Sequence, residues 1–182
     1  WKEEQVLLKA EFPVDIHSDK ATYEIQYGNL ERNTHSNTSW DKAQFEVVGH
    51  KWADISEDNY GVSLLNDCKY GYDIQGSTMR LTLLKSAKDP NEAADREVHN
   101  FKYSLYPHQG DWKKADTVKE AYKLNQPLFN RVLEKQEGKL EDNYSFIELA
   151  DENVILEVVK KAEDSNDIIV RVYEAYNRRT NT

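Results

Sequence analysis

A regular alternation of apolar and polar residues marks the segment VLLKAEFPV, at residues 6–14. Its side chains repeat with the period of two that is typical of a strand with one buried face in an antiparallel sheet. The apolar positions are Val6, Leu8, Ala10, Phe12 and Val14, and the polar positions between and after them include Lys9, Glu11 and Asp15. The same period predicts strands within residues 21–28, 78–86 and 100–106. A chain with this pattern is expected to fold mainly into antiparallel sheets.

Further strands are predicted where β-branched and aromatic residues are dense, at 44–55, 60–66, 144–149, 153–163 and 167–176. Turn-forming Asn, Asp, Gly and Pro residues separate many of these segments. About nine or ten short strands with frequent turns are typical of a sandwich of antiparallel sheets. We therefore predict one all-β domain over residues 1–182, with the fold of an antiparallel β-sandwich.

One segment, DTVKEAYKLNQPL at residues 116–128, departs from the strand pattern. Val118, Ala121 and Tyr122 recur at helical spacing, which indicates an amphipathic turn of helix. Thr117 and Glu120 have the spacing of a capping box, and a proline at 127 cannot continue a helix. The sequence predicts one short helix near 117–125. The polar stretch at 131–143 is expected to be a loop, or a hairpin with Gly138 at its tip.

Acidic residues outnumber basic ones, with 33 Asp and Glu against 24 Lys and Arg, so the formal net charge is -9 at pH 7. Proteins that bind the phosphate backbone need clustered Lys and Arg, and nucleic acid is therefore not expected as a partner. No apolar run approaches the roughly 20 residues that a helix needs to cross a bilayer, so a membrane is not expected as a partner either.

Cys68 is the single cysteine, which excludes a disulfide within the chain and any metal site with several cysteines. A lone cysteine suits a reducing compartment, and we expect a cytoplasmic protein with a buried, inert thiol at this position. The chain begins at Trp1 and has its single methionine at Met79. We therefore expect it to be a piece of a longer polypeptide, with further residues at one or both ends.

The five histidines show no H-x-x-x-H or H-x-H spacing, so the chain is expected to hold no metal site of its own. They are His17, His35, His50, His99 and His108. His50 and His99 lie in strand-like segments, whereas His108 is expected in a loop. The sequence also contains no G-x-S-x-G turn and no glycine-rich phosphate loop. Neither nucleophilic catalysis nor a nucleotide cofactor is therefore predicted for this chain.

The densest group of chemically active side chains lies in NYGVSLLNDCKYGYDI, at residues 59–74. Its members are Asn66, Asp67, Cys68, Lys69, Tyr70 and Tyr72. Acid, amide, thiol, amine and phenol groups so close together fit an active site, a sugar-binding loop or a solvated polar turn. The residues alone favour the turn. We expect residues 61–65 to form a core strand and residues 66–73 an exposed turn that follows it.

Four ordered blocks of sequence resemble a known family. They are RNTHSNTSWDKAQFEVVGHKWADISE at 32–57, GVSLLNDCKYGYDI at 61–74, RLTLLKSAKDP at 80–90 and FKYSLYPHQGDW at 101–112. Together they look like the C-terminal β-region of the α-mannosidases of glycoside hydrolase family 38, in its cytosolic and bacterial branch. The segments AYKLNQPL at 121–128 and VVKKAEDSNDIIVRVYE at 158–174 extend the resemblance to nearly the whole chain.

The resemblance implies a C-terminal fragment of a retaining, zinc-dependent exo-α-mannosidase, with a mutarotase-like β-sandwich fold. In that family an aspartate serves as nucleophile and zinc ligand, and a further aspartate and two histidines complete the zinc set. All of them lie outside the region that this chain resembles. The implied roles of the chain are to support its own N-terminal catalytic region and to place a loop at the pocket for mannose-containing glycans, while the parent enzyme holds the zinc.

The resemblance implies that a loop close to the substrate contains Asn66, Asp67, Lys69, Tyr70 and Tyr72. Asn66 and Asp67 would form hydrogen bonds with sugar hydroxyls, and Lys69 would supply a positive charge. Tyr70 or Tyr72 would offer a ring platform. Two other hypotheses stay open, namely a stand-alone carbohydrate-binding module and a purely structural β-domain.

Overall fold

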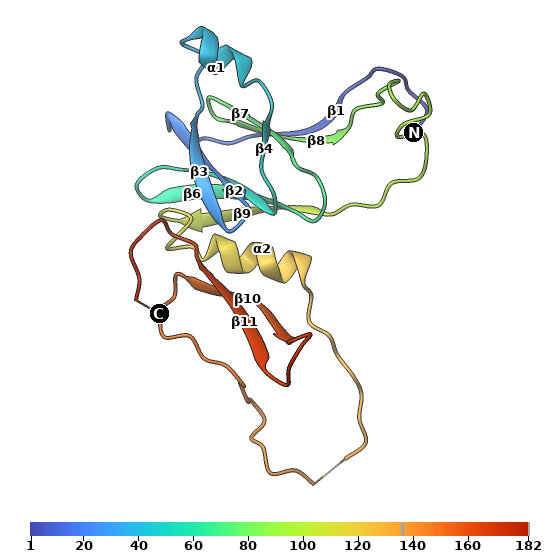
Figure 1. The fold of residues 1–182 in the computed structure, drawn as a ribbon. Coiled ribbons are helices and arrows are strands. Elements are labelled where there is room, and N and C mark those ends of the chain that lie inside the picture. The colour runs from blue at the N-terminus through green and yellow to red at the C-terminus, as the bar shows by residue number, and fades with distance from the viewer. Residues whose placement is uncertain (136, 182) are drawn as a thin grey trace.

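Antiparallel strands dominate the computed structural model, which describes residues 1–135 and 137–181 (Figure 1). The first sheet has the strand order β1-β8-β7-β4, with bounds Leu8–Pro13, Thr78–Leu84, Gly71–Gln75 and Val47–Val48. The second sheet has the order β3-β2-β5-β6-β9, with bounds Gly28–Asn33, Lys20–Ile25, Trp52–Ser56, Tyr60–Asn66 and Tyr103–Gln109. A hairpin of β10 (Val154–Lys161) and β11 (Ile168–Glu174) follows, and the helices are α1 (Ser39–Ala43) and α2 (Thr117–Asn125).

The main hydrophobic core lies between the first and second sheets. The first sheet contributes Tyr72, Ile74, Met79 and Leu81, and the second contributes Tyr23, Ala53, Ile55 and Leu64, each at most 1% exposed. Two antiparallel sheets that bury their facing side chains in this way form a β-sandwich. The predicted all-β sandwich is therefore confirmed.

The second sheet is also covered on its other face. Trp52 and Leu65 pack there in a second cluster, together with residues of α2, of β10, of the segment after β11 and of the loop before α2. These residues are Trp112, Val118, Ala121, Ile155, Ala175 and Tyr176. Figure 1 shows α2 between the second sheet and the hairpin. Because both faces of the sheet are covered, six consecutive residues of β6, 61–66, are buried rather than every second one.

Helix α2 spans Thr117–Asn125, which confirms the predicted helix, but its first turn differs from the prediction. The N-cap residue is Asp116, with a φ of 53° and no side-chain capping bond. Thr117 is fully buried, and its hydroxyl lies 2.8 Å from the hydroxyl of Ser63. The predicted capping box at Thr117 is therefore wrong, because that hydroxyl is turned into the protein interior.

Helix α1 has no counterpart in the sequence-based prediction. Thr38 caps it, since the Thr38 hydroxyl accepts from the Asp41 backbone N–H at 3.1 Å and the Thr38 N–H donates to the Asp41 carboxylate at 3.0 Å. The predicted strand at 44–55 is divided into β4 and β5. The two pieces belong to different sheets, so the chain crosses the sandwich at residues 49–51 and His50 lies in that crossing.

The predicted strand at 144–149 is wrong, because this segment has no strand and pairs with no other described strand. Most of its apolar side chains are exposed, including Phe146 at 87%, although Ile147 is half-buried. Residues 131–135 and 137–143 form no hairpin, and Gln136 lies outside the described residues. His99 precedes β9 and is not in a strand, contrary to the prediction. Neither α1 nor α2 has the length and apolar character that a membrane-spanning helix requires, within the residues that the structure describes.

Candidate functional site

Asn66 ends β6 and organises the turn that follows. Its side-chain oxygen accepts from the backbone N–H groups of Cys68, at 3.0 Å, and Lys69, at 2.5 Å. Its amide group donates to the carbonyl of His50, at 2.9 Å, and to the phenol of Tyr72. Asn commonly stabilises turns by accepting from backbone N–H groups two or three positions ahead. Asn66 is fully buried, so its hydrogen-bonding groups are used inside the protein.

Tyr72 lies in β7 and belongs to the main core. Its ring is fully buried and meets Tyr23 edge-on, with ring centroids 6.1 Å apart. Its hydroxyl donates to the carbonyl of His50 at 2.9 Å, and burial raises the pKa of this phenol. The prediction that residues 66–73 form an exposed turn is therefore wrong at Asn66, which is buried at the end of β6, and at residues 71–73, which begin β7 and include the buried Tyr72. Both side chains hold the turn in place from the protein interior.

The turn itself is residues 67–70, which we call the 67–70 loop; Cys68 and Tyr70 are exposed, and Asp67 and Lys69 are half-buried. The Asp67 carboxylate accepts from the Lys102 N–H at 2.9 Å, and the Asp67 N–H donates to the Lys102 carbonyl at 3.1 Å. Burial raises the pKa of the Asp67 carboxyl, but the bonds from Lys102 and Cys68 and the charge of Lys102 together outweigh burial, so the net shift is downward. Lys69 places its ammonium 4.9 Å from the centre of the Phe101 ring, and Tyr70 is 54% exposed. The loop is thus tied to the segment before β9 while its polar side chains reach the surface.

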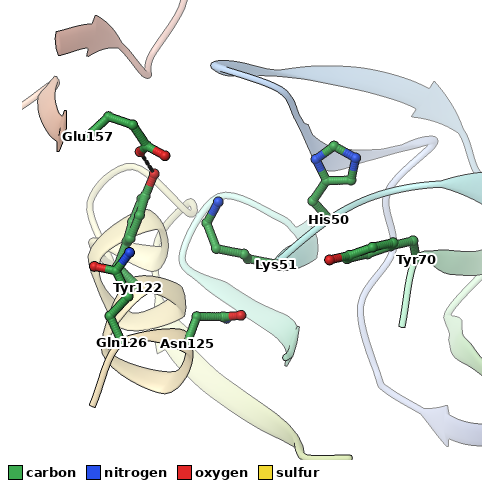
Figure 2. Close-up of a pocket in the computed structure, with 7 residues that line it drawn as sticks. All are labelled: His50, Lys51, Tyr70, Tyr122, Asn125, Gln126 and Glu157. Atoms are coloured by element: carbon green, nitrogen blue, oxygen red, sulfur yellow. Dashed lines mark hydrogen bonds between the residues drawn. The ribbon is translucent and has the colours of Figure 1, made fainter. Parts of the chain in front are cut away.

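A groove adjoins the 67–70 loop on the side of α2 and β10, and we call it the Lys51 groove (Figure 2). It has a volume of about 460 Å³ and is lined by His50, Lys51, Tyr70, Tyr122, Asn125, Gln126 and Glu157. A smaller hollow of about 190 Å³ shares four of these residues and adds Glu24, Tyr27 and Tyr173, among others. The groove therefore brings together segments that lie far apart in the sequence.

Ion pairs and hydrogen bonds hold the side chains of the Lys51 groove. The buried Glu24 carboxylate lies 2.8 Å from the Lys51 ammonium and accepts from the Lys51 backbone N–H at 2.6 Å. Burial raises the pKa of Glu24, although Lys51 opposes that rise. The Lys51 ammonium also lies 4.5 Å from the centre of the Tyr122 ring. Figure 2 shows Lys51 reaching toward Tyr122, with His50 and Tyr70 on its other side.

Tyr122 connects helix α2 to the hairpin across this groove. Its hydroxyl donates to the Glu157 carboxylate and lies 3.2 Å from the hydroxyl of Tyr173. Burial, followed by the bond to Glu157, raises the pKa of Tyr122, and burial raises the pKa of Tyr173 to about 12. Both phenols therefore stay protonated at neutral pH, and they act as hydrogen-bonding groups rather than as bases.

A buried polar cluster lies beneath α2, around Asp54 of β5. The Asp54 carboxylate accepts from the Ser63 hydroxyl at 2.7 Å and lies 2.7 Å from Nε2 of His108. Nδ1 of His108 lies 3.1 Å from the carbonyl oxygen of Gly110, so this nitrogen must carry a proton. In a Ser-His-Asp triad the carboxylate would bind Nδ1 and leave Nε2 to the serine. The cluster has a different arrangement and no exposed serine, and we assign it a structural role.

His108 lies within β9 and is 8% exposed, so its predicted place in a loop is wrong. Within residues 1–135 and 137–181, no three His, Cys, Asp or Glu side chains are arranged to hold a metal ion. The candidate site of this chain is therefore the 67–70 loop with the adjoining Lys51 groove. Of the five residues predicted for the loop, Tyr70 alone lines the groove.

Cys68 is exposed, which contradicts the expected buried thiol. Partial burial, and then the hydrogen bond and the charge of Asp67, raise the pKa of this thiol above its ordinary value. Because the thiolate is the reactive form, we expect native Cys68 to react slowly with iodoacetamide at pH 7.5 and faster as the pH rises above about 9. Peptide mapping by mass spectrometry would follow the rate at this residue.

The variant Asp67→Asn removes the nearby charge but keeps an acceptor for Lys102. We expect it to speed alkylation of Cys68 at pH 8 by about two- to fivefold. Asp15→Asn, at an exposed position near β1, serves as the control and is expected to leave the rate unchanged. A rate for Asp67→Asn equal to that of the unmodified chain would contradict the arrangement of the loop.

Comparison with known proteins identifies two segments of the chain. Residues 1–93 match the family model described as the glycosyl hydrolases family 38 C-terminal domain. Residues 153–182 match the one described as the glycosyl hydrolases family 38 C-terminal beta sandwich domain. The first match covers β1 to β8, including the 67–70 loop, and the second covers the hairpin.

Curated relatives match almost the whole chain. Alpha-mannosidase G of Dictyostelium discoideum is 45% identical over 181 residues, which is 99% of this chain and 17% of the relative. Alpha-mannosidase 2C1 of Homo sapiens is 44% identical over 179 residues, covering 97% of this chain and again 17% of the relative. The chain thus spans about one sixth of the length of these relatives.

A solved structure shares the fold. The crystal structure of an alpha-mannosidase from Enterococcus faecalis matches 93% of this chain and 20% of its own, with a TM-score of 0.80 and 21% identity. The family suggested by the four sequence blocks is confirmed by the family-model match and by these relatives. The chain belongs to glycosyl hydrolase family 38, in which it forms part of the C-terminal domains.

Proposed function

We propose that the chain is a non-catalytic, C-terminal β-sandwich part of a longer α-mannosidase, a retaining enzyme that releases terminal α-linked mannose from glycans. The observation that carries this proposal is the match to relatives named alpha-mannosidase, which extends over 99% of the chain but 17% of the relative. The rest of such a relative, outside the matched part, is long enough to contain the catalytic centre. The single Cys68 favours a reducing compartment such as the cytoplasm as the proposed location.

The zinc ion implied by the family resemblance does not fit the residues described in this chain. Zinc needs three or four nitrogen, sulfur or oxygen ligands around one point, and residues 1–135 and 137–181 offer no such group. We therefore assign the zinc ligands and the nucleophile of the proposed enzyme to the part of the longer protein outside this chain. No step of the reaction is assigned to residues of this chain.

The role proposed for this chain is to support the catalytic region and to present the 67–70 loop to the substrate. Asp67 and Lys69 would form hydrogen bonds with sugar hydroxyls, and the exposed ring of Tyr70 would pack on a sugar. Asn66 and Tyr72 would act through the loop, because their bonds to backbone groups at 50, 68 and 69 fix its shape. Rigid support of this kind reduces the conformational entropy that a loop loses when it binds a ligand.

Hydrolysis of para-nitrophenyl α-mannoside by the longer protein tests the proposed activity. We expect turnover that a zinc chelator abolishes and added zinc restores, and NMR is expected to show α-mannose as the first product. The chain of 182 residues alone is expected to be inactive. A folded longer protein that leaves α-mannosides uncleaved, or that first releases β-mannose, would contradict the proposed function.

A further inference from the structure

The Lys51 groove has the size and the lining of a ligand site. Its volume of about 460 Å³ falls within the range of pockets that bind small molecules. The groove is lined by two tyrosine rings and an imidazole together with four side chains that carry amide, ammonium or carboxylate groups.

Hydrogen-bond donors and acceptors are both available at the groove. Asn125 uses its amide N–H groups on the carbonyls of Asn66 and Ala121, each at 2.9 Å, and this leaves its side-chain oxygen as an acceptor. Gln126 forms no side-chain hydrogen bond with another described residue, so it can both donate and accept. Lys51 has three N–H donors, of which the contact with Glu24 needs one. A ligand whose own groups both donate and accept would match this set.

The charges at the groove favour a neutral ligand. Glu157 lines the groove, and Glu24 lies behind Lys51. An anion would meet two carboxylates beside one ammonium group, and a cation would have to compete with Lys51 for Glu24 and with the Tyr122 hydroxyl for Glu157. A neutral ligand rich in hydroxyls avoids both costs. The exposed ring of Tyr70 adds an apolar platform for the C–H face that such a ligand presents.

The groove is already organised before any ligand enters. Lys51 is held by Glu24 and by the Tyr122 ring, and Tyr122 is held by Glu157. Asn125 is held by two backbone carbonyls. Fixed side chains lose little conformational entropy when a ligand binds, so even a few hydrogen bonds yield measurable affinity.

We propose that the Lys51 groove binds a hexose unit of a glycan through Lys51, Asn125, Gln126 and Glu157. The ligand class, a neutral polyol, follows from the groove itself, whereas mannose as the particular sugar rests on the proposed function. The chain would then contact the glycan at two adjoining places, the 67–70 loop and this groove, with Tyr70 between them.

Photoaffinity labelling of the longer protein tests this proposal, because it shows which peptides lie next to the bound sugar. The probe is an α-mannoside that carries a diazirine, and the labelled peptides are mapped by mass spectrometry. We expect label in the peptides that contain residues 50–51 and 122–126, and we expect excess methyl α-mannoside to compete it away. Gln126→Ala is expected to reduce this label by about two- to tenfold, the effect of one lost hydrogen bond.

Two further variants make the test specific. Glu157→Gln keeps an acceptor for Tyr122 and removes the charge, and it is expected to change labelling in the same peptides without unfolding the hairpin. Gln109→Ala is the matched control, because Gln109 is an exposed glutamine of β9 outside the groove, and it is expected to leave the labelling unchanged. Absence of label from both groove peptides, or equal labelling in Gln126→Ala and Gln109→Ala, would overturn the proposal.

The failure of this proposal and that of the proposed function are distinguishable. Hydrolysis of the α-mannoside with no label in the groove would reject the groove site and leave the enzyme assignment in place. Label in the groove without hydrolysis would support a sugar-binding β-sandwich and reject the enzyme assignment. A structure of the longer protein with another segment of its chain inside the groove would also overturn the site.

Discussion

Replacement of Gly61 by alanine is expected to lower the free energy of unfolding by about 3 kcal/mol or more. A Cβ atom at this position would lie 2.3 Å from Cε1 of His108 and 2.7 Å from Cβ of Ser56, which is far inside normal contact distance. Gly61 is paired directly across from His108, so the imidazole cannot avoid the new methyl group without moving. Any such movement disturbs its bond with Asp54.

Equilibrium unfolding in urea, followed by tryptophan fluorescence, would measure the effect of Gly61→Ala. Gly28→Ala is the matched control, because a Cβ atom there meets nothing within 4 Å and Gly28 has no positive φ. We expect the control to shift the free energy of unfolding by less than about 1 kcal/mol. Equal unfolding midpoints for the two variants would contradict the close packing of Gly61 against His108.

Asp54→Ala is expected to lower the free energy of unfolding by about 3 to 5 kcal/mol, which is the other large effect that we predict. The Asp54 carboxylate is 1% exposed and accepts from the hydroxyls of Ser63 and Ser56, at 2.7 and 2.9 Å. It also pairs with His108. Alanine would leave these donors buried without their acceptor and would open a cavity beside them.

The conservative variant Asp54→Asn separates charge from shape. It preserves the side-chain volume and one acceptor, so we expect a smaller loss of stability than for Asp54→Ala. Asp58→Ala, at an exposed position before β6, is the control and is expected to change the free energy of unfolding by less than about 0.5 kcal/mol. A loss for Asp54→Ala as small as that for Asp58→Ala would show that the buried cluster contributes little to stability.

The alternation of apolar and polar residues predicted the strands that have one buried face. Strands β1 and β8 fall within the predicted segments, because their apolar residues alternate as the sheet requires. Strand β7 was missed because Gly71 and Asp73 are turn-forming residues, although Tyr72 and Ile74 between and after them point into the core. Strand β3 was missed because Leu30 is its single apolar side chain, and it forms through a hairpin with β2.

The segment at 144–149 was predicted as a strand from its composition alone, and it forms no strand because it lacks a pairing partner in the part of the chain that the structure describes. A strand needs a neighbour to satisfy its backbone groups, and none of the described strands lies beside this segment. Helix α1 shows the opposite case. Its short capping box at Thr38 and Asp41 is a local signal that the apolar residues after it obscured.

The candidate site was partly visible in the sequence. The 67–70 loop is contiguous, and its location could be predicted, whereas the burial of Asn66 and Tyr72 depends on packing between the sheets. The Lys51 groove could not be predicted, because it forms where α2 and β10 pack beside the start of β5. No spacing within the sequence relates Lys51, Tyr122 and Glu157 before the chain is folded.

The most direct test of the role proposed for the 67–70 loop is the effect of Lys69→Met on hydrolysis of para-nitrophenyl α-mannoside by the longer protein. Methionine keeps an apolar stem over Phe101 and removes the charge proposed to bind a sugar hydroxyl. We expect kcat/KM to fall by about tenfold or more, since hydrogen bonds to charged groups contribute about 1.5 to 3 kcal/mol. The control Lys42→Met, on the exposed side of α1, is expected to stay within about twofold of the unmodified enzyme. Equal kcat/KM values for Lys69→Met and Lys42→Met would contradict the claim that this chain places its 67–70 loop at the substrate.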